Sequence, residues 1–184
     1  MRVLWWVALL FSLASRLTAQ NAPSLEHQVQ AACLVKFTSF IEWPATPTNA
    51  ATNETFKIGI LGSDPFGSYF DEAVKTETVK GRPVQLKRGR EIAELEDCPV
   101  IYFGASESKR LAELLRQLEK KPVLTVAGEP ESARRGVMIN FVKKDGKVRF
   151  EFNLAAAERA GLRFSAKLKQ VGTIVVPGHT AADK

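Results

Sequence analysis

Hydrophobic residues along the chain form two kinds of pattern, short continuous runs and runs with helical spacing. The continuous runs are typical of strands covered on both faces, and they span residues 56–61, 83–87 (the weakest), 100–103 and 123–126. Apolar residues at steps of three and four predict helices over 66–75 and 106–120, with a short helical turn at 92–97 between them. Because strands and helices alternate, we expect an α/β fold, a three-layer sandwich with a mainly parallel sheet flanked by helices.

The pattern changes in the C-terminal third of the chain. Residues 137–142 and 147–152 are two β-rich runs on either side of the Lys-Asp-Gly segment 144–146. Asp-Gly between two such runs is a strong hairpin signal, because both residues accept the positive φ that a tight turn requires. We therefore expect a C-terminal antiparallel β-hairpin at one edge of the sheet.

Residues 25–42 have the pattern of an amphipathic helix. One face carries apolar side chains at steps of three and four: Val29, Cys33, Phe37, Phe40 and Ile41. The helix should end before Pro44, which disfavours helical backbone at Trp43. We expect this helix to cover one face of the sheet, with its aromatic end buried. Core packing is also the favoured interpretation for Trp43, whose indole N–H needs a partner or a path to solvent.

The segment 153–171 combines aliphatic and charged positions. We expect one helix over 154–160, capped by Asn153, and a last helix from its cap Ser165 to about residue 172. Aliphatic side chains would pack on the sheet and leave the charged ones outward, either simply solvated or free for a partner. The candidate partner-binding residues are Glu158, Arg163, Phe164 and Lys167, together with the region of Trp43.

The N-terminus has the pattern of a secretory signal peptide. Arg2 precedes an apolar run from Val3 to Ala14 that is too short for a comfortable membrane span, and small residues follow. We expect cleavage after Ala19, with Ala22 as the second choice, and consequently a periplasmic location; an uncleaved anchor or a buried helix is the alternative. The expected organisation is a signal peptide (1–19), a single α/β domain (20–176) and a flexible C-terminal tail (177–184).

The charge of the exported chain is only mildly positive. Loss of Arg2 and Arg16 with the signal peptide lowers the formal net charge from +6 to +4. Basic and acidic residues are interleaved, whereas nucleic-acid binding needs a basic stripe with interspersed aromatic residues. We therefore expect no nucleic-acid partner.

Two cysteines, Cys33 and Cys98, remain after cleavage. Export to an oxidising compartment allows a disulfide between them. The favoured alternative is two unpaired thiols buried as small apolar side chains. With two cysteines and two histidines far apart in the sequence, a structural zinc site is not expected.

The segment 62–67 (GSDPFG) follows the first strand, at the place where open α/β sheets bind ligands. Gly62, Ser63 and Asp64 are therefore candidate ligand-binding residues, since glycines and a helix N-terminus can hold an anion. The favoured interpretation is structural: Asp64 caps the next helix, Pro65 is its first residue and Gly62 eases the turn.

Motifs that would indicate an enzyme are missing from the sequence. There is no G-x-G-x-x-G, no phosphate-binding loop and no G-x-S-x-G. The strand at 100–103 is followed by Gly-Ala-Ser, where a phospho-acceptor receiver domain would have an acidic residue. His27 and His179 have no obvious nucleophile or acidic partner. We expect neither catalysis nor a bound cofactor.

An ordered set of segments is characteristic of one family. The segments are 36–44 (KFTSFIEWP), 56–67 (FKIGILGSDPFG), 81–84 (GRPV), 98–106 (CPVIYFGAS), 123–128 (VLTVAG), 136–141 (GVMINF) and 148–168 (VRFEFNLAAAERAGLRFSAKL). In this order they resemble the YfiR-like family of small exported bacterial proteins, and they extend over nearly all of the mature chain.

The resemblance implies a regulator rather than an enzyme. The best-known member of the family is a periplasmic repressor that contacts the periplasmic sensor domain of a membrane-bound diguanylate cyclase. An outer-membrane lipoprotein counters it, and cyclic-di-GMP output and biofilm formation follow. Since other members occur near sensor kinases and transport genes, a sensor kinase is the other candidate partner, and a homodimer is a further option.

The resemblance also bears on the cysteines and on ligands. The best-known member uses disulfides in regulation, but a chain with two cysteines cannot form two intramolecular bridges. The alternative function, suggested by the segment 62–67, is a periplasmic small-ligand-binding component of a sensor kinase or transport system.

Overall fold

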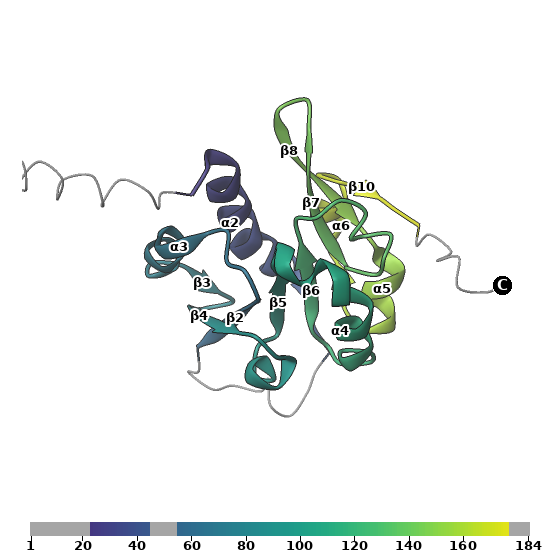
Figure 1. The fold of residues 1–184 in the computed structure, drawn as a ribbon, viewed down its shortest axis with the longest axis horizontal. Helices are drawn as coiled ribbons and strands as arrows, with labels where there is room; N and C mark the ends of the chain where they lie inside the picture. The colour runs from purple at the N-terminus through teal and green to yellow at the C-terminus, as the bar shows by residue number, and fades with distance from the viewer. Residues whose placement is uncertain (1–22, 45–54, 177–184) are drawn as a thin grey trace, which may run out of the picture.

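The computed structural model describes residues 23–44 and 55–176, so the expected signal peptide and C-terminal tail lie outside the described residues. Its centre is one mixed eight-stranded sheet (Figure 1). From one edge to the other the strands are β10 (Thr173–Ile174), β8 (Lys147–Phe152), β7 (Ile139–Lys144), β6 (Leu124–Ala127), β5 (Val100–Phe103), β2 (Phe56–Leu61), β4 (Arg82–Gly89) and β3 (Thr78–Val79). This order confirms the expected α/β fold class.

The five central strands, from β7 to β4, run parallel to one another, and antiparallel pairing enters only toward the edges. At one side β8 pairs antiparallel with β7 through the predicted hairpin, and β10 then adds to β8 in parallel. At the other side β3 pairs antiparallel with β4. The hairpin turn has positive φ at Asp145 (51°) and Gly146 (69°), as the Asp-Gly signal predicts.

Helices cover both faces of the sheet. Those on one face are α2 (Leu25–Thr38), α3 (Gly67–Val74), α5 (Leu154–Arg159) and α6 (Ala166–Lys169); those on the other are η3 (Ile92–Leu95), η4 (Ala105–Arg110) and α4 (Leu111–Gln117). Alternate strand residues serve the two faces, so that Ile58 and Ile60 of β2 pack in the first core while Leu61 packs in the second.

The predicted helix over 25–42 is shorter than the pattern suggested. It ends at Thr38, and Ile41–Glu42 form a short strand, β1, that pairs antiparallel with β9 (Arg163–Phe164). Its buried residues are Gln30, Ala31, Leu34, Val35, Phe37 and Thr38. The expected apolar face was therefore partly wrong: Val29 is exposed, and Ile41 is buried by strand pairing rather than by a helix.

Two other helices also differ from their predicted extent. The segment predicted as one helix over 106–120 divides into a 3₁₀ segment, η4, and the helix α4. The last helix stops at Lys169, and the chain then enters β10, which the pattern did not predict. There Val175 N donates a hydrogen bond to Phe152 O at 2.9 Å, so pairing with β8 replaces the helical hydrogen bonds.

Candidate functional site

The segment around Trp-Pro joins the N-terminal helix to the C-terminal part of the chain. Ile41 lies opposite Phe164 and Glu42 opposite Arg163 in the β1–β9 pair. Next to this pair, Ser165 N donates to the carbonyl of residue 40 at 3.0 Å. These bonds hold residues 163–165 beside β1, although the two segments are far apart in sequence.

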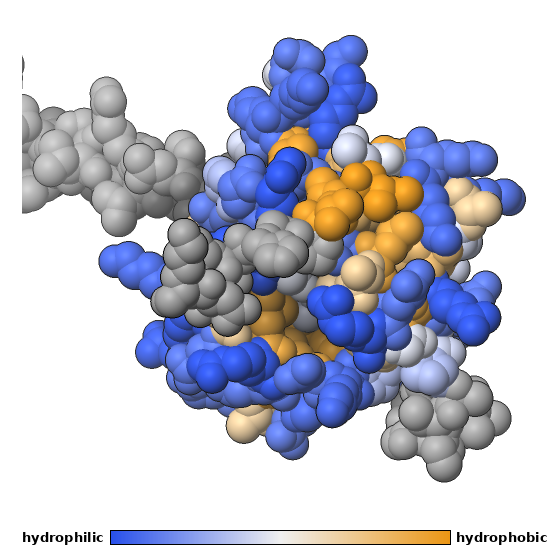
Figure 2. All heavy atoms as spheres, turned by 90° about the vertical axis from the view of Figure 1, so that its right-hand side faces the viewer, coloured by the Kyte–Doolittle hydropathy of each residue, from blue (hydrophilic) through white to orange (hydrophobic). Residues whose placement is uncertain are grey.

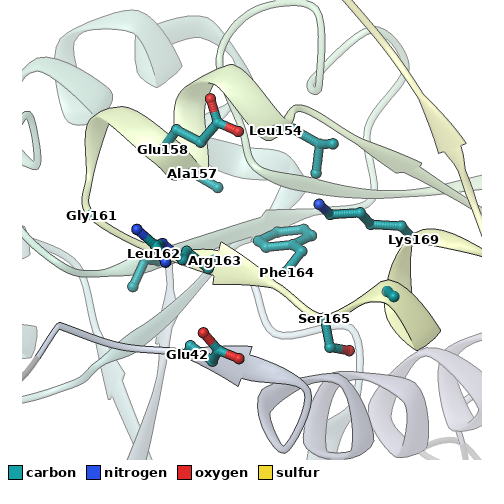
Figure 3. Close-up of a pocket in the computed structure, with 11 residues that line it drawn as sticks. Glu42, Leu154, Ala157, Glu158, Gly161, Leu162, Arg163, Phe164, Ser165 and Lys169 are labelled. Atoms are coloured by element: carbon teal, nitrogen blue, oxygen red, sulfur yellow. The ribbon is translucent and has the colours of Figure 1, made fainter.

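Between β1, α5, β9 and α6 the surface is hollowed by a pocket of about 580 Å³, which we call the C-terminal pocket (Figure 3). The residues that line it are Glu42, Leu154, Ala157, Glu158, Gly161, Leu162, Arg163, Phe164, Ser165, Ala166 and Lys169. Its volume is within the range of small-ligand and side-chain pockets. The pocket therefore offers a concave surface built mainly from the segment that the sequence singled out.

The rim of the C-terminal pocket carries both signs of charge. Glu42 and Glu158 supply carboxylates, and Arg163 and Lys169 supply cations; all four side chains are exposed. Among the described residues none of the four forms an ion pair, and Figure 3 shows their charged ends directed to different parts of the rim. Their charges are thus available to groups outside the protein.

Its floor is apolar. Phe164 is only 5% exposed, and its ring packs edge-on against that of Phe152, with the ring centroids 5.7 Å apart. Leu162 is fully buried beside it, whereas Leu154 is half-buried. Phe164 therefore belongs mainly to the core and offers a partner only the part of its ring that forms the floor.

The remaining two predicted contact residues lie outside the pocket lining. Lys167 is exposed on α6. Trp43 is half-buried next to Glu42; its ring packs against Phe56 with centroids 5.7 Å apart, and the ammonium of Lys80 lies 5.4 Å from the ring centre. The Trp43 indole N–H has no hydrogen-bond partner among the described residues, so the expected partner for this group is not found there.

A hydrophobic surface that the sequence analysis missed follows the pocket along the chain. Val171, Ile174 and Val176 are 53%, 53% and 78% exposed, and we call them the apolar edge because they lie within or close to β10, the last strand of the sheet. Figure 2 shows hydrophobic surface gathered on the face that carries β10, α5 and α6. Alternation of exposed Ile174, buried Val175 and exposed Val176 is the signal of a strand that could have revealed it.

The candidate ligand residues Gly62, Ser63 and Asp64 lie after β2, and their contacts are largely internal. The Asp64 carboxylate accepts hydrogen bonds from Phe66 N at 2.7 Å and Gly67 N at 3.2 Å, in the turn before α3. The helix itself begins at Gly67 with Phe66 at its N-cap, so the expected placement of Asp64 as the cap and Pro65 as the first helical residue was wrong. Gly62 has φ +78° and packs against Glu107, so a side chain there would collide with it. Only Ser63 and Asp64 reach a second cavity, of about 340 Å³.

The two thiols are free in the structure. Cys33 packs on the hydrophobic cluster of one sheet face, and Cys98 belongs to the cluster of the other face. The two clusters lie on opposite faces of the sheet, which supports the favoured interpretation of two unpaired apolar side chains over a Cys33–Cys98 disulfide. Burial raises the pKa of both, that of Cys98 to about 11 with a further contribution from Asp97.

Two other features are absent from the described ranges of the chain. No cluster of three or more His, Cys, Asp or Glu residues suited to a metal ion occurs within 23–44 and 55–176. Over the same ranges no helix has the length and apolar character needed to cross a membrane.

The chain forms a small α/β domain with a pocket and an exposed apolar edge on one side. The sequence profile of the YfiR/HmsC-like family matches residues 27–173, and the chain belongs to this family. It is a family of periplasmic regulators of diguanylate cyclase signalling, which is a regulatory rather than a catalytic role. None of the curated proteins matches the chain.

Two solved structures that match the chain differ widely from it in sequence. One is described as the ABC domain in complex with L-Trp from Streptococcus pneumonia; it is 12% identical, with a TM-score of 0.54 over 79% of this chain. A conserved domain protein from Vibrio cholerae is 13% identical over 83% of this chain, with a TM-score of 0.46. The chain spans 60% of the length of each of these structures. At such identity the first likeness concerns the fold alone.

Proposed function

We propose that this protein represses a membrane-bound diguanylate cyclase by binding its periplasmic sensor domain through the C-terminal pocket and the apolar edge. The observation that carries the proposal is the coincidence, on one face, of uncompensated rim charges with exposed aliphatic side chains. Membership of a family of periplasmic regulators supports this choice of partner.

The two parts of the surface contribute differently to binding. Val171, Ile174 and Val176 supply apolar area whose removal from water favours association. The rim charges set orientation and reject wrong partners more than they add affinity, because exposed charge pairs are screened. As β10 is the last strand of the sheet, its outer edge is also open to a partner.

Repression requires more than contact. A bound protein shifts a two-state sensor only as far as its affinities for the two states differ. We infer that the C-terminal surface fits the inactive conformation of the sensor domain better than the active one. Both proteins need only meet in the periplasm, this protein through its C-terminal surface and the cyclase through its sensor domain. No chemical step is required.

The proposal is tested by charge reversal on the rim. Deletion of the gene should raise cellular cyclic-di-GMP, and the wild-type gene should lower it again. Arg163→Glu should fail to restore repression and should weaken binding of the purified sensor domain, because a rim cation becomes an anion. Lys109→Glu is the matched control: Lys109 is exposed on η4, on the opposite face of the sheet.

Measurements of protein level and of the unfolding transition keep the result interpretable. Both variants should accumulate and unfold like the wild type, because exposed substitutions change stability by no more than about 0.5 kcal/mol. The proposal is wrong if deletion leaves cyclic-di-GMP unchanged, or if Arg163→Glu represses as well as Lys109→Glu does.

A further inference from the structure

The second cavity lies where an α/β sheet is best placed to bind a ligand. Strand β2 lies between β4 and β5. From β2 the chain first adds β4 on one side and then crosses over to add β5 on the other side, so the strand order reverses at β2. The loops after parallel strands part at such a point and leave a crevice at their carboxyl ends. The cavity occupies this crevice, with α2 as its other wall.

The cavity is open next to Gly128 because glycine has no side chain to fill the space. A Cβ atom at Gly128, just after β6, would lie 2.8 Å from the Tyr102 hydroxyl oxygen and 3.7 Å from Gln30 Oε1. Because residue 128 is glycine, this space is open and two oxygen atoms face it from different elements. A ligand group at that place could contact both.

One of these oxygens lacks the hydrogen bond that burial normally demands. Gln30 is 4% exposed, and its Oε1 has no partner among the described residues. Its amide Nε2 donates toward the Glu26 carboxylate at 3.5 Å, which leaves the carbonyl oxygen as the unpaired end. Buried acceptors are almost always paired, so an orphan that lines a cavity indicates a missing donor.

The cavity is also acidic. Three carboxylates line it, and two have partners: Asp64 pairs with Arg88 at 2.7 Å, and Glu26 with Lys143 at 2.9 Å. The half-buried Glu129 has no side-chain hydrogen bond or ion pair among the described residues. The pKa of Tyr102 is raised, first by burial and then by the charges of Glu129 and Asp64, as expected beside anionic groups.

We propose that this cavity binds a small organic cation through a primary ammonium group, which donates hydrogen bonds to Gln30 Oε1 and the Tyr102 hydroxyl and pairs with the Glu129 carboxylate. An ammonium has three donors and no acceptor, which matches the three groups. The carboxylates exclude the anion that the glycines after β2 first suggested. The volume of about 340 Å³ suits a ligand of a few carbon atoms.

The probe for this site is n-butylammonium, titrated into the purified exported protein by calorimetry and by thermal shift. We expect saturable one-to-one binding and a raised unfolding temperature. The neutral analogue n-butanol should bind far more weakly, because it has no charge. 4-Aminobutanoate should also bind more weakly, because its carboxylate meets the acidic wall.

Two substitutions test the assigned groups. Glu129→Gln should weaken n-butylammonium binding on the order of tenfold or more by removing the unpaired charge. Gln30→Leu should weaken binding while raising the unfolding temperature of the free protein, because an unpaired buried oxygen is replaced by an apolar group of similar size. The matched control, Glu113→Gln at an exposed position of α4, should leave binding unchanged.

Several results would overturn the assignment. It fails if n-butylammonium gives no saturable heat at millimolar concentration, if n-butanol or 4-aminobutanoate binds equally well, or if Glu129→Gln behaves like Glu113→Gln. These outcomes do not depend on the cyclase, so they are separable from failure of the proposed repression.

Discussion

Hydrogen bonds between two serines join the loop after β2 to the segment after β5, and both border the second cavity. Ser63 N donates to Ser106 Oγ at 2.9 Å, and Ser106 N donates to Ser63 Oγ at 3.2 Å. Gly104 allows this approach, because a Cβ there would lie 2.0 Å from the Ser63 carbonyl oxygen. A local role of Asp64 in the turn before α3 was predictable, since its bonds span three residues at most, although the cap of α3 is Phe66. The serine pair, 43 residues apart, was not predictable.

Another residue-scale feature is the carboxylate of Asp97, which contacts the ammonium groups of both Lys57 and Lys87. These contacts lower its pKa to about 2. In the unfolded chain the pKa is about 3.9. The pairing therefore stabilises the fold above pH 4, and the stabilisation is lost as the pH falls from about 4 toward 2.

Asp97→Asn measures this contribution. Because Asp97 is 44% exposed, solvent screening should limit the loss at pH 7 to about 1 kcal/mol or less. The difference from wild type should shrink as the pH falls toward 2 and also as salt is added. Denaturant unfolding at several pH values gives the comparison, with exposed Glu96→Gln as control. A difference that stays constant from pH 7 to pH 3 contradicts the linkage.

Among the elements, α6 is determined at its start by a local capping signal and at its end by pairing of the following residues with a distant strand. Ser165 was predicted as its cap, and Ser165 Oγ accepts a hydrogen bond from Leu168 N at 3.3 Å. The start of the helix was therefore correct. The predicted end of the helix was wrong, because residues 173–174 pair with strand β8 instead. A local sequence pattern cannot show this pairing, since β8 is distant in the sequence.

Ser165→Ala tests the cap. We expect the free energy of unfolding to fall by about 1 kcal/mol, because an N–H of the first turn loses its acceptor. Chemical denaturation measures the change. Ser39→Ala is the control, since Ser39 is exposed at the end of α2 and its side chain makes no cap bond; it should stay within about 0.5 kcal/mol of wild type. Equal effects of the two substitutions would show that the cap does not contribute.

For the whole molecule, the sheet separates two hydrophobic cores and with them the two thiols. Cys33 packs on the core that contains α2, and Cys98 lies in the core that contains α4. Neither thiol can reach the other without unfolding. We therefore expect no redox regulation through an internal disulfide between these two thiols.

Reductant should leave the unfolding temperature of the exported protein unchanged. Native protein should react slowly with an alkylating reagent, because burial raises both thiol pKa values and little thiolate exists at neutral pH. Denatured, unreduced protein should take up two alkyl groups, as intact mass will show. A denatured protein that reacts only after reduction would demonstrate a disulfide and contradict the free thiols.

The sequence by itself determined the features that depend on near neighbours. Continuous hydrophobic runs placed β2, β5 and β6, the Asp-Gly pair placed the β7–β8 hairpin, and caps placed the starts of α5 and α6. Each signal spans only a few residues, so the interactions that cause it can be inferred from a short stretch of the sequence. The order of these segments along the chain also indicated the family.

The tertiary structure alone decided which distant segments meet. Helix α2 ends early, and Ile41 then pairs with Phe164, which forms one side of the C-terminal pocket. Strand β10 pairs with β8, which places the apolar edge at the end of the sheet. It also brought Gln30 of α2, Tyr102 of β5 and Glu129 of the loop after β6 to one cavity. Such contacts depend on competition between strand pairing and helical hydrogen bonds across the whole chain, and that competition is settled only when the sheet assembles.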